Sequence, residues 1–308
     1  MNPPDSPLPD RYPLAIIGAG ALGLRFAARL AEVMPVAVIA RDDVRAARLR
    51  AGVTVGDHLY KPDVFPADTP PPADWVIVLV KAGDTADAAA IAARMDAQGV
   101  LSLQNGLTGK VLRAHCATGR VDQGITTEGA YRDGDHVWPS GAGETLVPAG
   151  FEPVAAMLAR AGLRARVEPD IGAARLAKLL VNVAINPLAA VHRVNNGALL
   201  APPLRAELDH LVREAWPVLR AEGLALDEPA ALARVHAVAA ATAANRASML
   251  QDVLASRRTE IDAITGALVQ MAARHGMAVP THDALYRAVK ALEPGNGLLS
   301  ESRPCTGT

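Results

Sequence analysis

The sequence predicts an α/β protein in which a doubly wound parallel sheet is followed by an all-helical domain. Three observations support this prediction. Short apolar runs alternate with alanine-rich helical stretches in the first half of the chain, as expected of parallel strands joined by helices. The first run ends in a glycine-rich turn that opens a helix. Beyond Pro169 almost every segment has the apolar period of a helix.

The expected strands are short apolar runs, at 14–18, 36–40, 75–80, 100–103 and 164–168. A helical stretch at 21–33 separates the first two strands, and this β-α-β order favours parallel pairing. The run WVIVLV at 75–80 is rich in β-branched side chains, as in a strand covered on both faces. Further helices are expected at 85–95 and 151–161.

Residues 124–147 have a different character. Short segments alternate with turn signals such as Asp133-Gly134, which predicts a small antiparallel extension. Later helices are expected at 170–193, 203–223, 228–245 and 249–276. The predicted organisation is a disordered leader at 1–13, a sheet domain at 14–168, a helical domain at 169–292 and a loose tail at 293–308.

Composition narrows the functional classes. The chain has 308 residues, half of them hydrophobic, and a formal net charge of −1, which argues against a general nucleic-acid binder. Its two cysteines, Cys116 and Cys305, lack disulfide or metal-site spacing, so no metal is expected and a reducing cytoplasmic setting fits. No uninterrupted apolar stretch is long enough for a membrane span.

The glycine-rich turn is the clearest motif, with the sequence Gly18-Ala19-Gly20-Ala21-Leu22-Gly23. Gly18 permits a tight turn, Gly20 lets the backbone approach a pyrophosphate, and Gly23 allows the helix to pack closely on the sheet. The helix N-terminus offers N–H groups to the phosphates. Because the motif follows a strand and opens a helix, it predicts a Rossmann-type dinucleotide site.

Arg41 follows the second strand, where NAD enzymes usually carry an acidic residue for the ribose 2′-hydroxyl. A guanidinium suits the 2′-phosphate of NADP(H), so NADP(H) is the expected cofactor. The alternative is a solvated surface arginine beside Asp42 and Asp43. Lys81 and Asn105 follow two further strands and should also face the cofactor, although a surface lysine and an Asn-Gly turn would fit the same positions.

Lys178, Asn182 and Asn186 recur every four residues and share one face of an otherwise apolar helix. Such a helix is buried, so its polar stripe should meet a partner, a water-filled cleft or a ligand. The alternative is a narrow solvent-facing stripe. A second polar row, which includes Asn245, Ser248 and Glu260, would by itself indicate only an amphipathic helix.

Together these motifs resemble the ketopantoate reductase (2-dehydropantoate 2-reductase) family. The resemblance runs from about residue 14 to 290, through GAGALG, VKA at 80–82, QNG at 104–106, KLLVNVAINPL at 178–188, NNG at 195–197 and SMLQDVLASRRTEIDAITG at 248–266. It implies NADPH-dependent reduction of ketopantoate to (R)-pantoate, in a cleft between a dinucleotide-binding domain and a helical domain. One departure is Gln104, where some relatives have His.

The resemblance also implies residue roles. Lys178 would be the general acid, supported by Glu260 next to the nicotinamide ribose. The implied substrate contacts besides Lys178 are Asn182, Asn186, Asn196, Asn245 and Ser248. The implied cofactor contacts beyond the glycine turn are Arg41, Lys81, Asn105, Ala130 and Glu260.

The expected partner is a small 2-keto acid, with no nucleic acid or membrane, and a homodimer is compatible with the sequence. Three alternatives stay open: a D-2-hydroxy-acid dehydrogenase for another branched or aromatic keto acid, a non-catalytic NADP(H) sensor, and a dehydrogenase of imines or amino acids.

Overall fold

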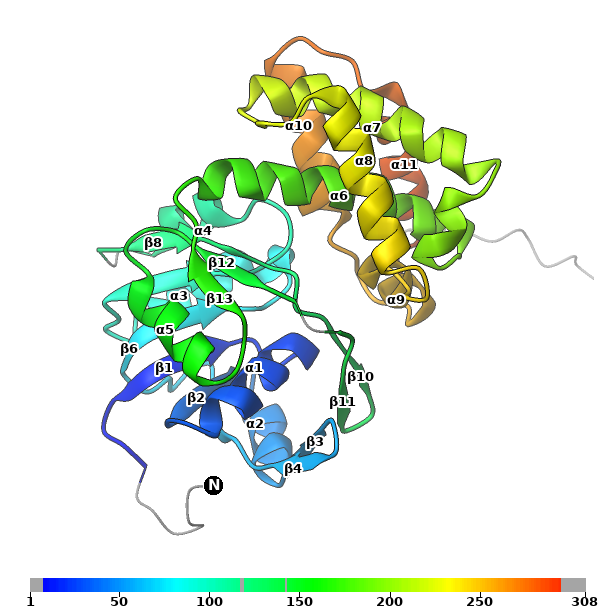
Figure 1. Ribbon diagram of the computed structural model, residues 1–308. Helices are drawn as coiled ribbons and strands as arrows, with labels where there is room; N and C mark the ends of the chain where they lie inside the picture. Colours follow the sequence, from blue (N-terminus) through cyan, green and yellow to red (C-terminus); the bar gives the residue numbers. More distant parts are fainter. Residues whose placement is uncertain (1–7, 117–118, 142, 295–308) are drawn as a thin grey trace, which may run out of the picture. The chain divides into compact units, whose positions relative to one another are not determined.

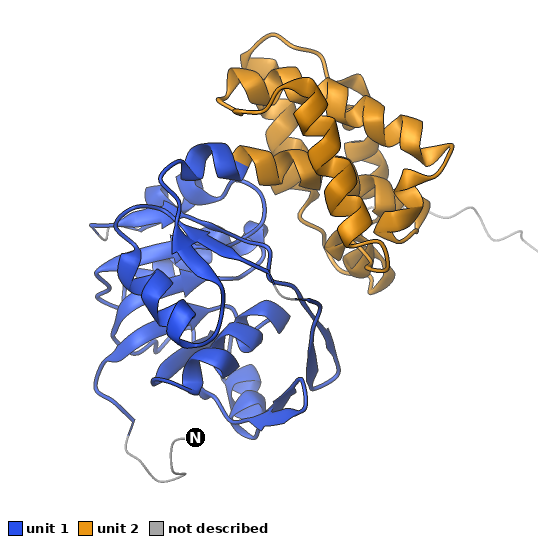
Figure 2. Ribbon diagram, in the orientation of Figure 1, with its two compact units in different colours: residues 1–175 blue, residues 176–308 orange. Residues whose placement is uncertain are grey.

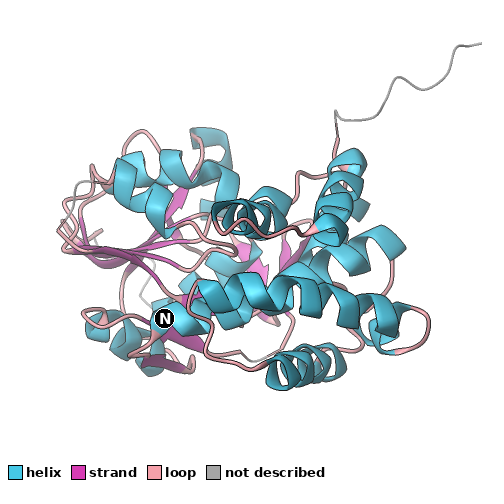
Figure 3. Ribbon diagram, turned by 90° about the horizontal axis from the view of Figure 1, so that it is seen from above, coloured by secondary structure: helices cyan, strands magenta, loops and turns pink. Residues whose placement is uncertain are grey.

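The computed structural model describes residues 8–116, 119–141 and 143–294, and the chain divides into two compact units, 1–175 and 176–308 (Figure 2). All the described strands lie in the first unit, and the regular structure described in the second unit is helical (Figure 3). The division falls inside helix α6 (Ile171–His192), a few residues beyond the boundary expected from the sequence.

The main sheet of the first unit has six strands in the order β5-β2-β1-β6-β7-β8, and every neighbouring pair is parallel. The strands are β1 (Tyr12–Ile17), β2 (Val36–Ala40), β5 (Asp63–Pro66), β6 (Ala73–Val78), β7 (Gly99–Ser102) and β8 (Val121–Gln123). This confirms the predicted doubly wound sheet. The strand order changes direction between β1 and β6, which is where open parallel sheets bind ligands beyond their carboxyl ends.

Helices cover both faces of this sheet because successive side chains of each strand point to opposite sides. In β1, Leu14 and Ile16 belong to one core cluster, together with apolar side chains of α1 (Ala21–Ala31), α2 (Asp43–Arg50) and α5 (Glu152–Arg160). Ala15 and Ile17 belong to the other, with α3 (Thr85–Ala92) and α4 (Gly109–His115) (Figure 1). The strands are therefore apolar on both sides, as their sequences predict.

Two smaller sheets complete the first unit. One has the order β10-β11-β3-β4, with β10 (Ala130–Asp133), β11 (His136–Pro139), β3 (Val53–Val55) and β4 (His58–Tyr60). Its β10–β11 hairpin turns at Asp133-Gly134, as predicted. The other has the order β13-β12-β9, with β9 (Ile125–Thr126), β12 (Thr145–Val147) and β13 (Ala165–Val167). Strands β3, β4, β5 and β8 were not expected from the sequence.

Beyond the larger part of α6, the second unit is built from further helices. They are η2 (Asn196–Leu200), α7 (Leu204–Ala221), α8 (Glu228–Ala241), α9 (Ser248–Leu254), the π-helical η3 (Asp262–Gly266), α10 (Ala267–Arg274) and α11 (Pro280–Leu292). The predicted continuous helix at 249–276 is wrong. It breaks after Leu254 because Ser256 adopts a positive φ of 49° and Arg257 folds back onto Asp252, its guanidinium 3.0 Å from the carboxylate. The predicted helix at 228–245 ends early, at Ala241.

Both predicted chain ends need correction. Tyr12, assigned to the leader, is fully buried and starts β1, while residues 1–7 lie outside the described residues. Glu293, assigned to the loose tail, is also buried. Its carboxylate accepts hydrogen bonds from the backbone N–H and hydroxyl of Thr259, at 2.8 and 2.7 Å. Residues 295–308 lie outside the described residues.

Helix α6 is long and apolar enough to cross a membrane by length and composition alone. Within its most apolar window, however, 67% of the residues are buried inside the protein. That is the pattern of a core helix.

Candidate functional site

The turn between β1 and α1 is built from three glycines with different constraints. Gly18 has a φ of +123°, and a Cβ there would lie 2.7 Å from the carbonyl carbon of Leu79. A Cβ on Gly23 would lie 1.9 Å from the carbonyl oxygen of Gly18, so the helix packs against its own turn. At Gly20 a Cβ would meet no atom within 4 Å. The turn is thus tight on its inner side and open at Gly20.

This open side is suited to an anion. Gly20 is the N-cap of α1, no side chain caps the helix there, and its first turn carries no acidic residue. The first N–H groups of a helix have no intrahelical acceptor and attract phosphate. The glycine turn therefore has the shape and electrostatics of a pyrophosphate cradle, in which Ala19, Ala21 and Leu22 supply the remaining backbone.

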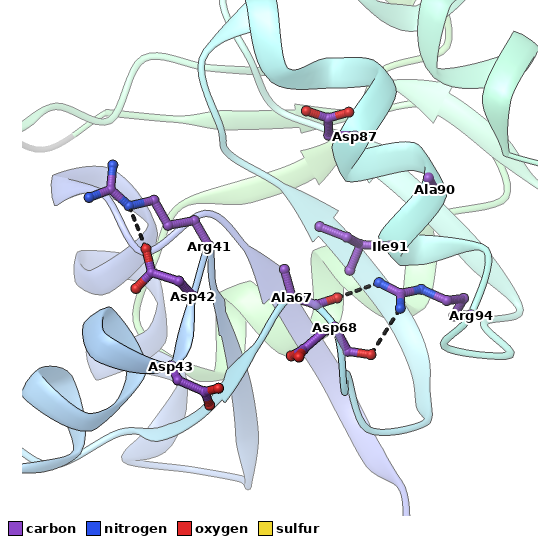
Figure 4. Close-up of a pocket in the computed structure, with 9 residues that line it drawn as sticks. All are labelled: Arg41, Asp42, Asp43, Ala67, Asp68, Asp87, Ala90, Ile91 and Arg94. Atoms are coloured by element: carbon purple, nitrogen blue, oxygen red, sulfur yellow. Dashed lines mark hydrogen bonds and ion pairs between the residues drawn. The ribbon is translucent and has the colours of Figure 1, made fainter.

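Arg41 lies directly beyond β2 with a largely exposed side chain, and its Nε donates to a carboxylate oxygen of Asp42 at 2.9 Å. A groove of about 500 Å³ opens beside it, near the carboxyl ends of β2 and β5 (Figure 4). The wall residues are Arg41, Asp42, Asp43, Ala67, Asp68, Asp87, Ala90, Ile91 and Arg94. This volume is within the range of small-molecule sites, and Ala67, Ala90 and Ile91 offer apolar contacts to a flat ring.

Lys81 and Asn105 follow β6 and β7, so the sheet order sets Arg41, the glycine turn, Lys81 and Asn105 beyond successive strand ends. The buried side chain of Gln104 connects the loop that carries Lys81 with the loop that carries Asn105. The Nε2 of Gln104 lies 3.0 Å from the Val80 carbonyl oxygen, 3.3 Å from that of Lys81 and 3.0 Å from the Thr85 hydroxyl. Gln104 therefore braces the segment that carries Lys81 from the position directly before Asn105.

A second buried glutamine fixes the loop after Asn105. The Oε1 of Gln123 accepts the backbone N–H groups of Thr108 and Gly109, both at 3.0 Å, and its Nε2 donates to the Gly106 carbonyl at 2.7 Å. Sequence reasoning missed this residue. Its strand, Val121-Asp122-Gln123, is too short and too polar to stand out in the sequence.

Ala130 begins β10, in a different sheet from the other proposed cofactor residues of this unit. Arg25 of α1 holds the loop before Ala130 against the helix that follows the glycine turn. It donates to the carbonyls of Gly129 and Gly141 at 2.6 and 2.9 Å, and forms a buried ion pair with Glu128. An arginine inside the apolar helix sequence was the signal for this contact, which sequence reasoning also missed.

In the second unit, the polar stripe of α6 lies mostly below the surface. Asn186 is buried, and Lys178 and Asn182 are partly buried. Burial lowers the pKa of the Lys178 ammonium to about 8, although the negative charge of Glu260 raises it. The Lys178 ammonium thus lies within electrostatic reach of the Glu260 carboxylate.

Glu260 is positioned by the unpredicted break between α9 and η3. The preceding residue, Thr259, is held by Glu293 from the end of α11, and Glu293 forms an ion pair with Lys290 at 2.8 Å. A side chain within a regular helix is positioned by the backbone hydrogen bonds of its own helix. The residue before Glu260 is instead held by Glu293, more than thirty positions further along the chain.

Asn196 and Asn245 are brought together by the early end of α8. The backbone N–H of Asn196 donates to the Asn245 carbonyl at 3.0 Å, and the Asn196 amide donates to the Thr242 hydroxyl at 2.9 Å. Asn196 is buried, and its Oδ1 has no hydrogen-bond partner among the described residues. Asn245 and Ser248 are exposed.

Comparison with known proteins identifies the family. The model of the ketopantoate reductase PanE/ApbA family matches residues 14–150, and that of its C-terminal domain matches residues 170–293. The chain belongs to the ketopantoate reductase family. It is therefore an oxidoreductase with the two-part fold predicted from its sequence.

Relatives from this family span nearly the whole chain. A 2-dehydropantoate 2-reductase of Archaeoglobus fulgidus is 35% identical over 291 residues, which are 91% of this chain and 97% of the relative. The structure of a probable 2-dehydropantoate 2-reductase from Bacillus subtilis is 30% identical with a TM-score of 0.75, covering 91% of this chain and 99% of that one.

A structure of D-mandelate dehydrogenase with NADH and anilino(oxo)acetate superposes with a TM-score of 0.82, over 91% of this chain and 97% of that one. It is only 24% identical, so this likeness shows the shared fold alone.

Proposed function

We propose that this member of the ketopantoate reductase family reduces ketopantoate to (R)-pantoate with NADPH, a step in the supply of pantothenate and coenzyme A. The observation that carries the proposal is Lys178, a partly buried amine with a pKa of about 8 and Glu260 nearby. A proton donor works best when its pKa lies near the working pH. The relatives at 32–45% identity that are named 2-dehydropantoate 2-reductases support the choice of substrate.

The dinucleotide would be held by the glycine turn at 18–23, with Arg41 at its 2′-phosphate and Lys81, Asn105 and Ala130 along its length. Glu260 would contact its nicotinamide ribose. The open side of Gly20 and the uncapped start of α1 suit its pyrophosphate. When bound, the reduced nicotinamide supplies a hydride to the C2 carbonyl carbon of the keto acid.

Lys178 would stabilise the negative charge that develops on the carbonyl oxygen and then donate a proton to it. An ordinary lysine is a weak acid at neutral pH. With a pKa of about 8 the ammonium is still mostly protonated at pH 7, yet gives up its proton more readily. Glu260 keeps the charged form populated in a setting that would otherwise discharge it.

The remaining polar residues would bind the substrate. Asn182 and Asn186 lie on the same face of α6 as Lys178, and the unpartnered Oδ1 of buried Asn196 can accept a hydrogen bond from a substrate hydroxyl. Asn245 and Ser248 would add donors for the carboxylate. This set recognises an anionic hydroxy acid without adding negative charge.

The test is NADPH oxidation by the purified protein with ketopantoate, repeated with NADH and with a panel of branched and aromatic 2-keto acids. The highest kcat/KM is expected with ketopantoate and NADPH. A higher value with another keto acid would reassign the substrate, and no oxidation with any of them would favour an NADP(H) sensor. We also propose a cytoplasmic, reducing setting, in line with two cysteines that lack disulfide spacing.

A further inference from the structure

The turn after β2 contains a second arginine, Arg45, one helical turn beyond Arg41. A single carboxylate fixes both residues. One oxygen of Asp42 accepts the backbone N–H of Arg45 at 2.7 Å and so caps α2, while its other oxygen accepts the Nε of Arg41 at 2.9 Å. Asp42 therefore holds the Arg41 side chain and the backbone from which the Arg45 side chain extends.

The Arg45 side chain extends toward the glycine turn. It is partly buried, and its Nη2 donates to the carbonyl of Ala19 at 3.3 Å. In this fold the pyrophosphate lies on the glycine turn and the adenosine ribose lies toward the end of β2. The Arg45 guanidinium thus contacts the turn that would anchor the pyrophosphate, and it comes from the helix that starts just after Arg41, where the ribose with the 2′-phosphate would lie.

Arg45 also retains unused hydrogen-bonding capacity. A guanidinium has five N–H donors, and the Ala19 carbonyl is the only acceptor found for this side chain among the described residues. Neighbouring arginines differ. Arg48, on the same helix, binds the Asp135 carboxylate at 2.8 Å, and Arg94 is occupied by the carbonyls of Ala67 and Asp68. Arg45 is the arginine of this turn that has no carboxylate partner within the described chain.

The charges around the groove favour a further cation beside the 2′-phosphate. The groove beside Arg41 is lined by four aspartates and two arginines, and Arg94 is held by backbone carbonyls. Asp42 already offsets Arg41. Without a further cation, the 2′-phosphate would contact the Arg41–Asp42 ion pair, which has no net charge, next to the carboxylates of the other aspartates. A planar guanidinium can bind a phosphate through two parallel hydrogen bonds.

We propose that Arg45 is a second ligand of the 2′-phosphate and a determinant of the preference for NADPH over NADH. The inference rests on the proposed NADPH-dependent function. Asp42 is then the residue that orients both arginines, rather than an acceptor for a ribose hydroxyl as in NAD-binding sites.

Binding measurements on the full-length protein test this without turnover. Dissociation constants are measured by calorimetry for NADPH, NADH, adenosine 2′,5′-bisphosphate and 5′-AMP, with wild type, Arg45→Ala and the matched control Arg48→Ala. Arg45→Ala should weaken NADPH and the bisphosphate by about tenfold or more, as for the loss of a hydrogen bond to a charged group. NADH and 5′-AMP should change less than about twofold, and Arg48→Ala should change none of the four.

Each other outcome has a definite meaning. Equal weakening of NADPH and NADH by Arg45→Ala would mean that the residue only shapes the glycine turn, and the proposal fails. Unchanged NADPH affinity would also overturn it. Wild type that prefers NADH would overturn the 2′-phosphate site while leaving a reductase possible. Wild type that binds neither coenzyme would instead overturn the proposed function. Thermal melting of each variant verifies that the fold is retained.

Discussion

The two units of this protein build their halves of the proposed chemistry in different ways. In the first unit, the glycine turn offers backbone N–H groups at the start of α1, and its shape depends on missing side chains. In the second unit, the pKa of Lys178 on α6 depends on its burial and on the charge of Glu260, which lies in the loop before η3. A backbone-built site thus depends on where side chains are absent, whereas a side-chain-built site depends on charges brought together from distant segments.

The largest expected effect is on the side-chain-built half. Lys178→Ala should lower kcat for ketopantoate reduction by roughly 10²–10⁴-fold, because it removes the proposed proton donor. NADPH affinity should stay within about threefold, since the glycine turn belongs to the other unit. Stopped assays with saturating NADPH and direct binding titrations separate the two quantities.

Lys110→Ala removes an exposed lysine of α4 and serves as the control. Near-normal kcat in Lys178→Ala would show that another group, or water, protonates the product. A large rise in the NADPH dissociation constant would show that the two halves are not separable in this way.

The backbone-built half is tested by two substitutions of the same size. Gly23→Ala adds a Cβ 1.9 Å from the Gly18 carbonyl oxygen, so it should lower the free energy of unfolding by about 1–3 kcal/mol, as overpacking does. Gly20→Ala meets no neighbour and should leave stability unchanged while weakening NADPH about tenfold, because the methyl group occupies the approach of the pyrophosphate.

Urea unfolding and NADPH titration of both variants measure these effects. Equal loss of stability in the two variants would contradict the distinction between the packed and the open side of the turn. Unchanged NADPH affinity in Gly20→Ala would mean that the phosphates do not approach the backbone there.

This difference also explains what the sequence could predict. The reasons for Gly18, Gly20 and Gly23 are local, so the motif and the apolar strands around it indicate the site directly. Strand β3 forms a local hairpin with β4, but both strands are only three residues long and so leave little periodicity to read. Its other partner, β11, lies about eighty residues further along the chain. The break before Glu260 was missed for the same kind of reason, since Glu293 stabilises it from the end of α11. Periodicity alone favours an unbroken helix there.

Unit 2 also carries histidine–carboxylate pairs along α7, and the most buried of them gives a stability prediction. Burial would raise the pKa of Glu214, but hydrogen bonds from the His282 side chain and the backbone N–H groups of Thr281 and His282 lower it to about 2. The folded-state pKa lies below the unfolded value, so Glu214 stabilises the fold above about pH 4.5, and this contribution is lost as pH falls toward 2.

Glu214→Gln should therefore lower the free energy of unfolding by about 2–3 kcal/mol at pH 7. The gap from wild type should narrow as pH falls below 4.5. Glu207→Gln removes the more exposed partner of His192 and should cost less than about 1 kcal/mol. Urea titrations at several pH values measure both, and a deficit in Glu214→Gln that does not depend on pH would rule out the ionised carboxylate as its source.

The smallest expected effect is a shift in pH dependence caused by Glu260. Lys178 acts as an acid only when protonated, so kcat for reduction should be level below about pH 8 and fall above it. Glu260 raises the pKa of Lys178, and Glu260→Gln should therefore move the fall to lower pH. The loss of kcat relative to wild type should be several-fold at pH 8 and small at pH 6, because at low pH both enzymes are protonated.

Asp262→Asn is the matched control, since this carboxylate lies two residues further on and pairs with Lys290 instead. It should leave the midpoint of the pH profile unchanged. If Glu260→Gln lowers kcat equally at every pH, Glu260 acts by binding the coenzyme ribose and not through the charge of Lys178. A midpoint that moves in Asp262→Asn as well would mean that the general field of the helical unit, and not one carboxylate, sets the acidity of the amine.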